Sequence, residues 1–468
     1  MGFETVEDVR LTGWEASSTD SAADEVWALV IAWSAEGLER LGEVALFGGA
    51  GPFVLGRGPE GDGVRVTFVR QRPGEQPAAS PIEAKGISRD QVRFTPDDGL
   101  VATNVGRCKM FVNGEPQDEA TLGEGDTLLL HNQLLLVCER RPARLAPLRS
   151  LPSDAVPAFG AADRFGIVGE SSVIWGLRER AATVANTPEH VLVLGDSGAG
   201  KELAARLIHA LSREGPFTAR NAATIPDALV DAELFGNAKN YPNPGMAERA
   251  GLVGEADGGT LMLDEVAELP ERSQASLLRV LDGGGEYHRL GDSSQRRSSF
   301  RFVGATNRSK EELKHDLLAR LTSRILVPGL TDRRADIPLI ARHLLAARCR
   351  ETPAYAERFG GEQLRVAPQL MERLVRHPYT HHVRELSRLV STALATSPGN
   401  FVALTEEVEA ELGAPPTPVT RDVEPSAEDI QSALDVAKGS RAKAAKALGL
   451  SSRFVLYRLM KRHGLDAD

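Results

Sequence analysis

A glycine-rich loop between an apolar run and a helical pattern constrains this chain more than any other feature. The apolar run is Val191-Leu192-Val193-Leu194, and the loop reads Gly195-Asp196-Ser197-Gly198-Ala199-Gly200-Lys201-Glu202. In a strand–loop–helix unit the backbone N–H groups of the loop surround an oligophosphate, and a lysine reaches the outer phosphates. We therefore expect residues 195–202 to bind a nucleoside triphosphate.

A second motif follows downstream, where Gly258-Gly259-Thr260-Leu261-Met262-Leu263 leads to Asp264-Glu265. An apolar strand that ends in two carboxylates predicts an Mg²⁺ ligand in Asp264 and a residue that orients or deprotonates water in Glu265. A glycine turn between a strand and a helix would explain the first motif alone. The two motifs in this order favour hydrolysis. Because Glu202 stands where a hydroxyl usually contacts Mg²⁺, the metal would depend more on Asp264, water and phosphate oxygens.

Length and composition set further limits. A chain of 468 residues predicts about three domains. A net charge of −10 argues against a chain covered in nucleic-acid-binding charge. The three cysteines, Cys108, Cys138 and Cys349, have no paired spacing, so neither a zinc site nor a disulfide framework is expected. No apolar stretch near Met1 could span a bilayer, and we expect a cytoplasmic protein.

Changes of pattern divide the chain into segments. Short β-rich runs predict an all-β sandwich, prolines and alanines predict linkers, alternating strands and helices predict a parallel α/β sheet, and helical periodicity predicts all-α parts. The segments are 25–141 (sandwich), 142–163 (linker), 164–341 (α/β), 342–412 (helical), 413–424 (linker) and 425–468 (helical and basic).

Seven motifs after the glycine loop give the α/β and helical segments a family resemblance. Residues 167–389 resemble the AAA+ domain of bacterial enhancer-binding proteins, the activators of sigma-54 RNA polymerase, in which residues 342–412 would be the helical lid. The motifs are Pro216-Phe217 leading to Asn221, Glu233-Leu234-Phe235-Gly236, Gly258 to Leu269, Leu277 to Leu281, Ala305-Thr306-Asn307-Arg308, Arg333 to Pro338, and Val383-Arg384-Glu385-Leu386.

The resemblance implies roles for individual residues. Asn221 would relay the state of Glu265, Thr306 and Asn307 would form sensor I near the γ-phosphate, and Arg384 would be sensor II. Arg320 would act as an arginine finger on the nucleotide of the neighbouring subunit, which implies a hexameric ring. Lys314 replaces the family's first finger, and lysine lacks the planar fork of arginine.

The loop that contacts the sigma factor in this family has a different sequence here. Asn240, Tyr241, Pro242, Asn243, Pro244 and Gly245 occupy the place of the family's GAFTGA loop. The Phe-Thr pair is absent, and the two prolines predict a stiffer loop. Tyr241 could supply the aromatic contact; alternatively, the loop has lost it. His381 and His382 stand in the approach to Arg384 where the family has Gly-Asn, and we expect them to be solvated or packed rather than metal-bound.

The N-terminal sandwich resembles a forkhead-associated (FHA) domain, a phosphothreonine-binding fold. Gly56-Arg57, Ser88-Arg89 and Phe111-Val112-Asn113-Gly114 carry the likeness. Arg57 and Ser88 match the family's phosphate contacts, and Arg89 and Arg107 or Lys109 would add charge. Gln91 replaces the usual histidine. A sandwich that only docks on the ATPase is the alternative.

The basic C-terminal segment resembles the Fis-type helix-turn-helix that ends these activators. Residues 438–463 contain no acidic residue. Helices are expected at 430–437 and 441–448, with a recognition helix at 452–463. A solvated helical hairpin is the alternative to DNA binding. The predicted DNA contacts are Ser452, Arg453 and Phe454 at the start of the recognition helix, and Lys443, Arg458, Lys461 and Arg462 at phosphates.

The sequence thus predicts a multidomain protein: an FHA-like sandwich, an α/β AAA+ P-loop domain with a helical lid, and an all-α helix-turn-helix. Its expected partners are double-stranded DNA, sigma-54 RNA polymerase, a phosphothreonine protein or peptide, and further copies of itself. The leading hypothesis is an ATP-hydrolysing activator of sigma-54 RNA polymerase. The alternative is a regulator or repressor that uses ATP as an assembly switch and does not engage sigma-54.

Overall fold

The computed structural model divides the chain into two compact units. One comprises Met1–Pro147, Thr331–Pro378 and Leu389–Asp468, and the other comprises Leu148–Leu330 and Tyr379–Arg388. The structure describes residues 25–49, 51–59, 63–75, 79–97, 99–212, 214–282, 284–308, 315–361, 363–414, 425–437, 441–448 and positions 450, 456, 459, 460, 463 and 465.

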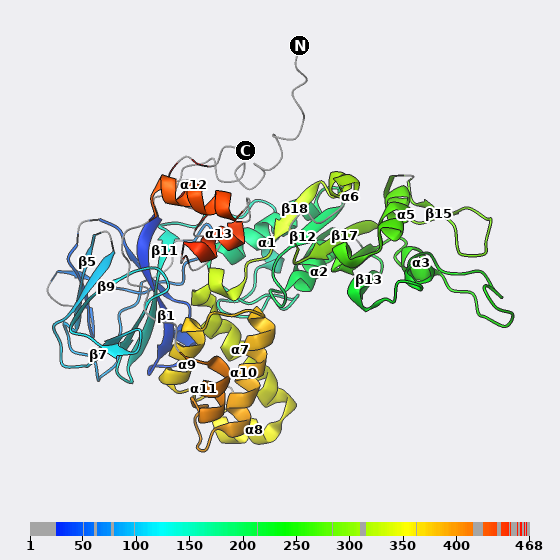
Figure 1. Cartoon of the computed structure of the whole chain (residues 1–468). Helices are drawn as coiled ribbons and strands as arrows, with labels where there is room; N and C mark the ends of the chain where they lie inside the picture. The colour runs from blue at the N-terminus through cyan, green and yellow to red at the C-terminus, as the bar shows by residue number, and fades with distance from the viewer. Residues whose placement is uncertain are drawn as a thin grey trace, which may run out of the picture. The chain divides into compact units, whose positions relative to one another are not determined.

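Two mainly antiparallel sheets form a β-sandwich in the N-terminal part of the first unit (Figure 1, blue to cyan). Their strand orders are β2-β1-β11-β10-β7-β8 and β4-β3-β5-β6-β9. Phe47 joins them, because its ring packs edge-on against Phe53 and Phe94 with centroids 5.3 Å apart. The predicted all-β fold is confirmed. The strands are β1 Glu25–Ser34, β2 Val44–Phe47, β3 Phe53–Leu55, β4 Val64–Arg65, β5 Val92–Pro96, β6 Leu100–Asn104, β7 Met110–Val112, β8 Glu115–Pro116, β9 Glu119–Leu122, β10 Thr127–Leu130 and β11 Leu134–Pro142.

Strand β1 is buried over most of its length because both of its faces are covered. Ala28 and Val30 pack with Ala335, which precedes the lid helices. The indole Nε1 of Trp33 donates to the carbonyl of Val366 at 2.8 Å. This explains why the strand reads as a continuous apolar run rather than as an alternating one.

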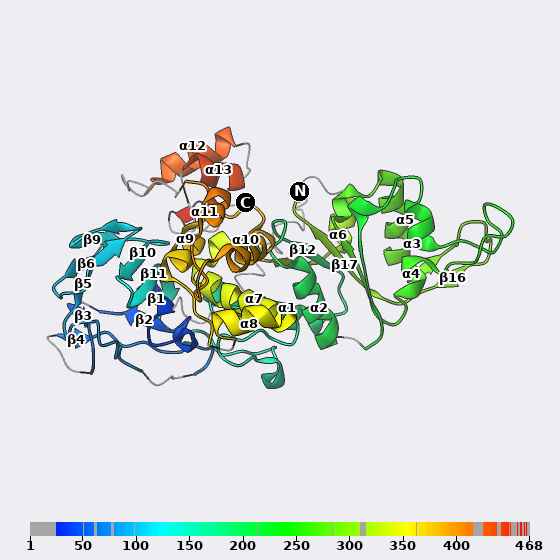
Figure 2. The ribbon, with the colours of Figure 1, turned by 90° about the horizontal axis from the view of Figure 1, so that it is seen from below.

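Five of the described helices form the lid (Figure 2, yellow to orange); four lie in the first unit, and the first residues of the fifth, α10, belong to the second unit. Proline at the first or second position begins three of them, where its missing N–H costs no helical bond. The boundary predicted at 341/342 falls inside α7, whereas the unit that contains the parallel sheet ends at Leu330. The helices are α7 Ile337–Glu351, α8 Pro353–Phe359, α9 Pro368–Arg376, α10 His382–Thr396 and α11 Glu406–Leu412.

A five-stranded sheet, with the order β13-β14-β17-β12-β18, is the centre of the second unit. Every neighbouring pair is parallel, as predicted, so the carboxyl ends of the strands share one edge. The strands are β12 Val191–Leu194, β13 Phe217–Asn221, β14 Thr260–Asp264, β17 Arg301–Thr306 and β18 Ser323–Leu326, and the helices are α1 Ser172–Ala185, α2 Lys201–Ser212, α3 Val230–Phe235, α4 Gly251–Glu255, α5 Glu271–Asp282 and α6 His315–Arg320.

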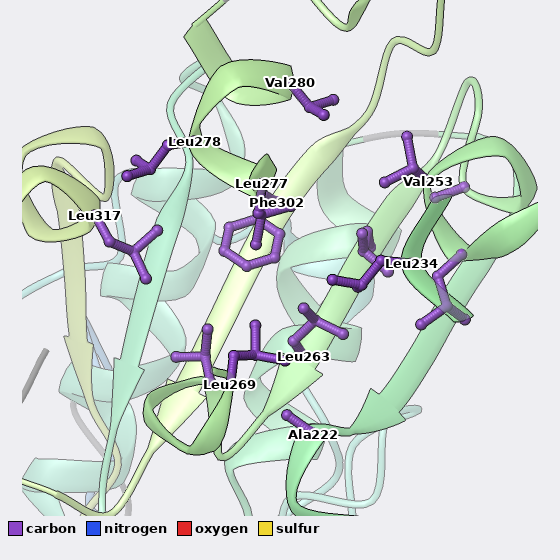
Figure 3. Close-up of a cluster of buried hydrophobic side chains, with 14 of the residues drawn as sticks. Ala222, Leu234, Val253, Leu263, Leu269, Leu277, Leu278, Val280, Phe302 and Leu317 are labelled. Atoms are coloured by element: carbon purple, nitrogen blue, oxygen red, sulfur yellow. The ribbon is translucent and has the colours of Figure 1, made fainter. Parts of the chain in front are cut away.

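One face of this sheet is closed by a cluster of buried apolar side chains (Figure 3). Leu263 of β14 and Phe302 of β17 point into it from the sheet, and Leu277 of α5 covers them. Leu234 and Leu317 extend the cluster to α3 and α6. This packing fixes the positions of β14 and β17, and the residues of the site described below lie at the ends of these strands.

The predicted linker 142–163 begins within β11 and then runs along α1. Glu179 of α1 accepts hydrogen bonds from the backbone N–H groups of Arg149, Ser150 and Leu151. Further on, Glu170 accepts one from Gly160. From Leu148 onward this proline-rich segment is therefore part of the second unit.

The C-terminal segment contains the two helices α12 Ala427–Val436 and α13 Arg441–Ala447. A reciprocal pair of bonds between Ser426 and Asp429 caps α12. Ile430, Ala444 and Met460 share a small apolar core. The two predicted helices are confirmed. Ser452, Arg453, Phe454, Arg458, Lys461 and Arg462 lie outside the described residues, as does the side chain of Lys443.

In the part of the chain that the structure describes, no helix combines the length and the apolarity that crossing a membrane requires.

Candidate ATP site

The glycine loop connects β12 to α2, as the sequence predicted. Gly198 and Gly200 have φ angles of 79° and 107°, which only glycine adopts readily. A Cβ atom on Gly198 would also lie 2.2 Å from the carbonyl oxygen of His381. Lys201 begins α2 and is 7% exposed, and its Nζ donates to the carbonyl of Gly195 at 3.1 Å. The loop thus has the strand, glycines and lysine of a phosphate cradle.

Asp264 and Glu265 end β14 beside this cradle. Oδ1 of Asp264 accepts a hydrogen bond from the backbone N–H of Glu265 at 3.0 Å. Glu265 has a left-handed φ of 51°, and its Oε1 lies 3.7 Å from Nζ of Lys201. Its Oε2 accepts from the N–H of Asn307 at 3.3 Å. Three motifs that are distant in sequence therefore meet at the carboxyl edge of the sheet.

The residues beside the cradle suit a magnesium ion. Mg²⁺ takes oxygen ligands and is usually held by one or two carboxylates together with substrate phosphates. Asp264 and Glu265 place two carboxylates next to the phosphate loop, and Asp264 is the one that would hold the ion. Glu202 is turned elsewhere, since its exposed carboxylate accepts from Arg206 at 2.7 Å.

Asn221, Thr306 and Asn307 also lie at this edge. Asn221 is the register partner of Asp264, and its side chain accepts from the N–H of Ala223. Thr306 is fully buried, and its carbonyl accepts from the N–H of Gly195 at 3.3 Å. Thr306 ends β17, the strand that pairs with β12 before the nucleotide loop, and Asn307 follows it, whereas Asn221 ends β13 at the far edge of the sheet.

Arg384, the predicted sensor II residue, reaches the glycine loop directly. Its guanidinium donates to Oγ of Ser197 at 3.4 Å. The N–H of Val383 donates to the carbonyl of Gly198 at 3.1 Å. His382 is 3% exposed and bonds Asp196, whereas His381 is exposed and its ring contacts the hydroxyl of Thr380.

The structure describes one of the two predicted finger residues, Arg320, but not the other. Arg320 is the last residue of α6, is about half exposed, and forms an ion pair with Asp282. An exposed arginine at a helix end can reach a neighbouring subunit if it leaves this partner. Lys314 lies outside the described residues.

Hydrogen bonds hold the loop at 240–245 at its base. Buried Asn237 donates through Nδ2 to the carbonyls of Ala238, Tyr241 and Ala247 at 2.9, 3.3 and 3.0 Å. Within the loop, Oδ1 of Asn240 accepts from the N–H of Gly245 at 2.9 Å.

An ion pair and an aromatic contact also stabilise this loop. Arg249 donates to Glu233 at 2.8 Å, which closes the base of the loop. The ring of Tyr241 lies against Gly291, yet Tyr241 and Met246 remain 41% and 45% exposed. Tyr241 of the loop and Met246, the residue that follows it, therefore present an aromatic and a thioether side chain to solvent beside a hydrogen-bonded loop base.

A second cluster of predicted site residues gathers in the sandwich. The N–H of Arg57 donates to the carbonyl of Ser88 at 2.9 Å, and the N–H of Arg107 donates to Oγ of Ser88 at 3.1 Å. Arg89 follows directly in the chain, and its carbonyl accepts from Arg65 at 2.8 Å. The backbones of Arg57 and Arg107 thus both contact Ser88, and Arg89 is its neighbour in the chain.

Gln91 organises this cluster, a role that residue type alone did not reveal. It is fully buried, and its Oε1 accepts from the N–H groups of Ser88 and Cys108. Its Nε2 donates to Asn104 and to the carbonyl of Cys108. The sequence signalled this role only through position, since Gln91 stands where the resemblance to an FHA domain leads us to expect histidine.

Comparison with known proteins agrees with this site. The chain matches the Sigma-54 interaction domain over residues 167–327 and the AAA+ ATPase lid domain over residues 331–418. The transcriptional regulatory protein ZraR of Escherichia coli (strain K12) is 33% identical over 323 residues, which are 66% of this chain and 71% of that protein. The nitric oxide reductase transcription regulator NorR1 of Cupriavidus necator is 34% identical over 434 residues, 80% of this chain and 83% of that one. The crystal structure of NtrX from Brucella abortus in complex with ATP is 28% identical, covers 64% of this chain and 69% of its own, and has a TM-score of 0.46.

Proposed function

The chain belongs to the sigma-54-dependent transcriptional regulators with an AAA+ ATPase domain, and on this premise we propose that it couples ATP hydrolysis to the remodelling of sigma-54 RNA polymerase at DNA. The observation that carries the proposal is the meeting of Lys201, Glu265 and Asn307 at one sheet edge. These residues come from the glycine loop and from the ends of two parallel strands, as a phosphoryl-transfer site requires.

The hydrolytic roles follow from the chemistry of the side chains. Lys201 would neutralise the outer phosphates of ATP, and Glu265 would orient or deprotonate the attacking water. Mg²⁺ held by Asp264 would supply charge neutralisation on the phosphates. Arg320 would stabilise the transferring group on the neighbouring subunit of a ring once it leaves Asp282. Asn221 would relay the state of Glu265 from the adjacent strand.

We propose that the braced loop 240–245 contacts sigma-54. The exposed Tyr241 and Met246 favour this role, because aromatic and methionine side chains are enriched at protein interfaces. Asn237 and the Glu233–Arg249 pair would transmit a movement of the loop base to its tip. Pro242, Asn243, Pro244 and Gly245 would shape the tip.

Two further activities complete the proposal. Arg57, Ser88, Arg89 and Arg107 would bind a phosphothreonine segment, since arginine side chains suit a phosphate dianion and the backbones of Arg57 and Arg107 both hydrogen-bond Ser88. The segment 425–468 would bind DNA as a helix-turn-helix, which the helix pair α12–α13 and the absence of acidic residues at 438–463 support.

A pull-down of sigma-54 by the full chain, with and without an ATP transition-state analogue, tests the main proposal. We expect a complex that requires the analogue. The variant Tyr241→Ala should lose this complex while keeping its ATPase activity. Phe401→Ala is the matched control, because Phe401 is a similarly exposed aromatic residue, at 46%.

An intact ATPase that forms no nucleotide-dependent complex would overturn the sigma-54 role. It would leave a regulator that uses ATP as an assembly switch.

A further inference from the structure

The first three residues of α10 form contacts with three successive residues of the glycine loop. His382 bonds Asp196, Arg384 bonds Ser197, and Val383 bonds Gly198. Two of these contacts involve only the backbone or the predicted sensor. The third, between His382 and Asp196, has no role in the hydrolytic chemistry described above.

The hydrogen-bond partners of His382 define its tautomer. Its Nδ1 accepts from the backbone N–H of Leu330 at 3.1 Å, so this nitrogen carries no proton. The remaining ring proton is then on Nε2, which lies 3.3 Å from Oδ2 of Asp196. The neutral ring therefore donates to the carboxylate and joins two backbone segments.

The local structure is shaped around this ring. His382 has a left-handed φ of 44°, which Asn, Asp and His tolerate better than other side chains. A Cβ atom on Gly329 would lie 2.4 Å from the ring, so glycine at that position leaves room for it. The ring is buried, whereas the carboxylate of Asp196 is about half exposed.

The negative charge of Asp196 is unfavourable in a phosphate-binding loop, and the contact with His382 offsets this effect. Its backbone belongs to a loop that binds a polyanion, so its carboxylate would repel phosphate if it turned inward. The bond from His382 holds the carboxylate beside the first turn of α10.

We propose that His382 is a positioning residue for nucleotide binding, which holds the Asp196 carboxylate away from the phosphates and so keeps the glycine loop in its binding conformation. The inference rests on the ATP site described above. Equilibrium binding of ATP can be measured without turnover, so a failure of this inference is distinguishable from a failure of hydrolysis or of sigma-54 engagement.

Two substitutions of His382 separate nucleotide affinity from stability. His382→Asn tolerates the left-handed backbone and places an acceptor near the Nδ1 position, but it cannot reach Asp196. We expect it to raise the Kd and KM for ATP by about threefold to tenfold, with kcat within about twofold of the wild type. His382→Gln keeps an N–H donor near the Nε2 position. It should retain the wild-type Kd even though its backbone preference lowers the thermal midpoint.

The decisive measurement uses Asp196→Asn, which removes the charge. In this background the substitution His382→Asn should no longer weaken binding, so the Kd of the double variant should equal that of Asp196→Asn alone. His381→Ala is the matched control, because that ring is exposed and contacts Thr380.

An unchanged Kd in His382→Asn would overturn the proposal, and so would a loss that Asp196→Asn does not suppress. A purely structural role predicts that His382→Asn and His382→Gln change the Kd alike, in step with their thermal midpoints.

Discussion

The Nζ atom of Lys201 lies 3.7 Å from Oε1 of Glu265, and both side chains are largely buried at 6% and 16% exposure. The pair joins the start of α2 to the residue after β14. It brings the cation that would meet the γ-phosphate next to the carboxylate that would activate water. Removing the charge of Lys201 should therefore weaken phosphate binding, whereas removing that of Glu265 should impair the activation of water.

Glu265→Gln should abolish ATP turnover, by about two to four orders of magnitude, while ATP still binds. The amide keeps the size of the side chain and an acceptor for Asn307, but it cannot take a proton. Steady-state hydrolysis and equilibrium ATP binding check this. Glu268→Gln is the matched control, because Glu268 is also an acid of this segment but pairs with Arg308. Unchanged turnover in Glu265→Gln would refute the assignment.

Arg320→Ala should lower hydrolysis by about three to five orders of magnitude if Arg320 acts across a subunit interface. The informative experiment mixes this variant with Glu265→Gln. Each is inactive alone, yet a mixed ring contains sites that combine an intact Glu265 with an Arg320 from the neighbour. Activity should therefore reappear on mixing. An inactive mixture, with ring formation verified, would place Arg320 outside the neighbouring active site.

Arg57→Ala should weaken binding of a phosphothreonine peptide by about tenfold to a hundredfold, because a charge-assisted hydrogen bond to phosphate is lost. Titration of labelled peptides against the full chain measures this. Arg93→Ala is the control, since Arg93 is an exposed arginine on strand β5. Equal binding of phosphorylated and unphosphorylated peptides by the wild type would instead favour a sandwich that only docks on the ATPase.

Glu372 should make the stability of the sandwich and lid depend on pH. Burial raises the pKa of the Glu372 carboxyl, while the bond from Thr127 and the charge of Arg376 oppose that rise. A raised pKa in the folded state means that stability from this group is present at low pH and is lost as the pH rises through that pKa.

Glu372→Gln keeps an acceptor for Thr127, whose Oγ1 lies 3.0 Å from the carboxylate. Because the amide does not titrate, the thermal midpoint of this variant should fall less than that of the wild type as the pH rises from about 5 to about 8. Glu357→Gln serves as the control, because Glu357 is exposed on α8. Parallel pH profiles for Glu372→Gln and the wild type would contradict the prediction.

Some strands of the sandwich could not be predicted from the sequence pattern. Long apolar strands such as β1 and β11 were evident from composition, but β6 and β9 were not. Both are short: in β6, LVATN, buried positions alternate with partly exposed ones, and in β9, EATL, the last position alone is buried. Such strands are fixed by pairing with their neighbours, which β-propensity does not record.

The sequence by itself determined the nucleotide loop, the Asp264–Glu265 pair and the α/β order. Each depends on residues adjacent in the chain, whose spacing imposes a strand, a turn or a helix start. The tertiary structure decided the contacts between distant residues. It paired His382 with Asp196, made Gln91 the centre of the arginine cluster, and set Arg320 against Asp282. The physical reason is that strand order and packing choose which loops meet, and no local pattern carries that choice.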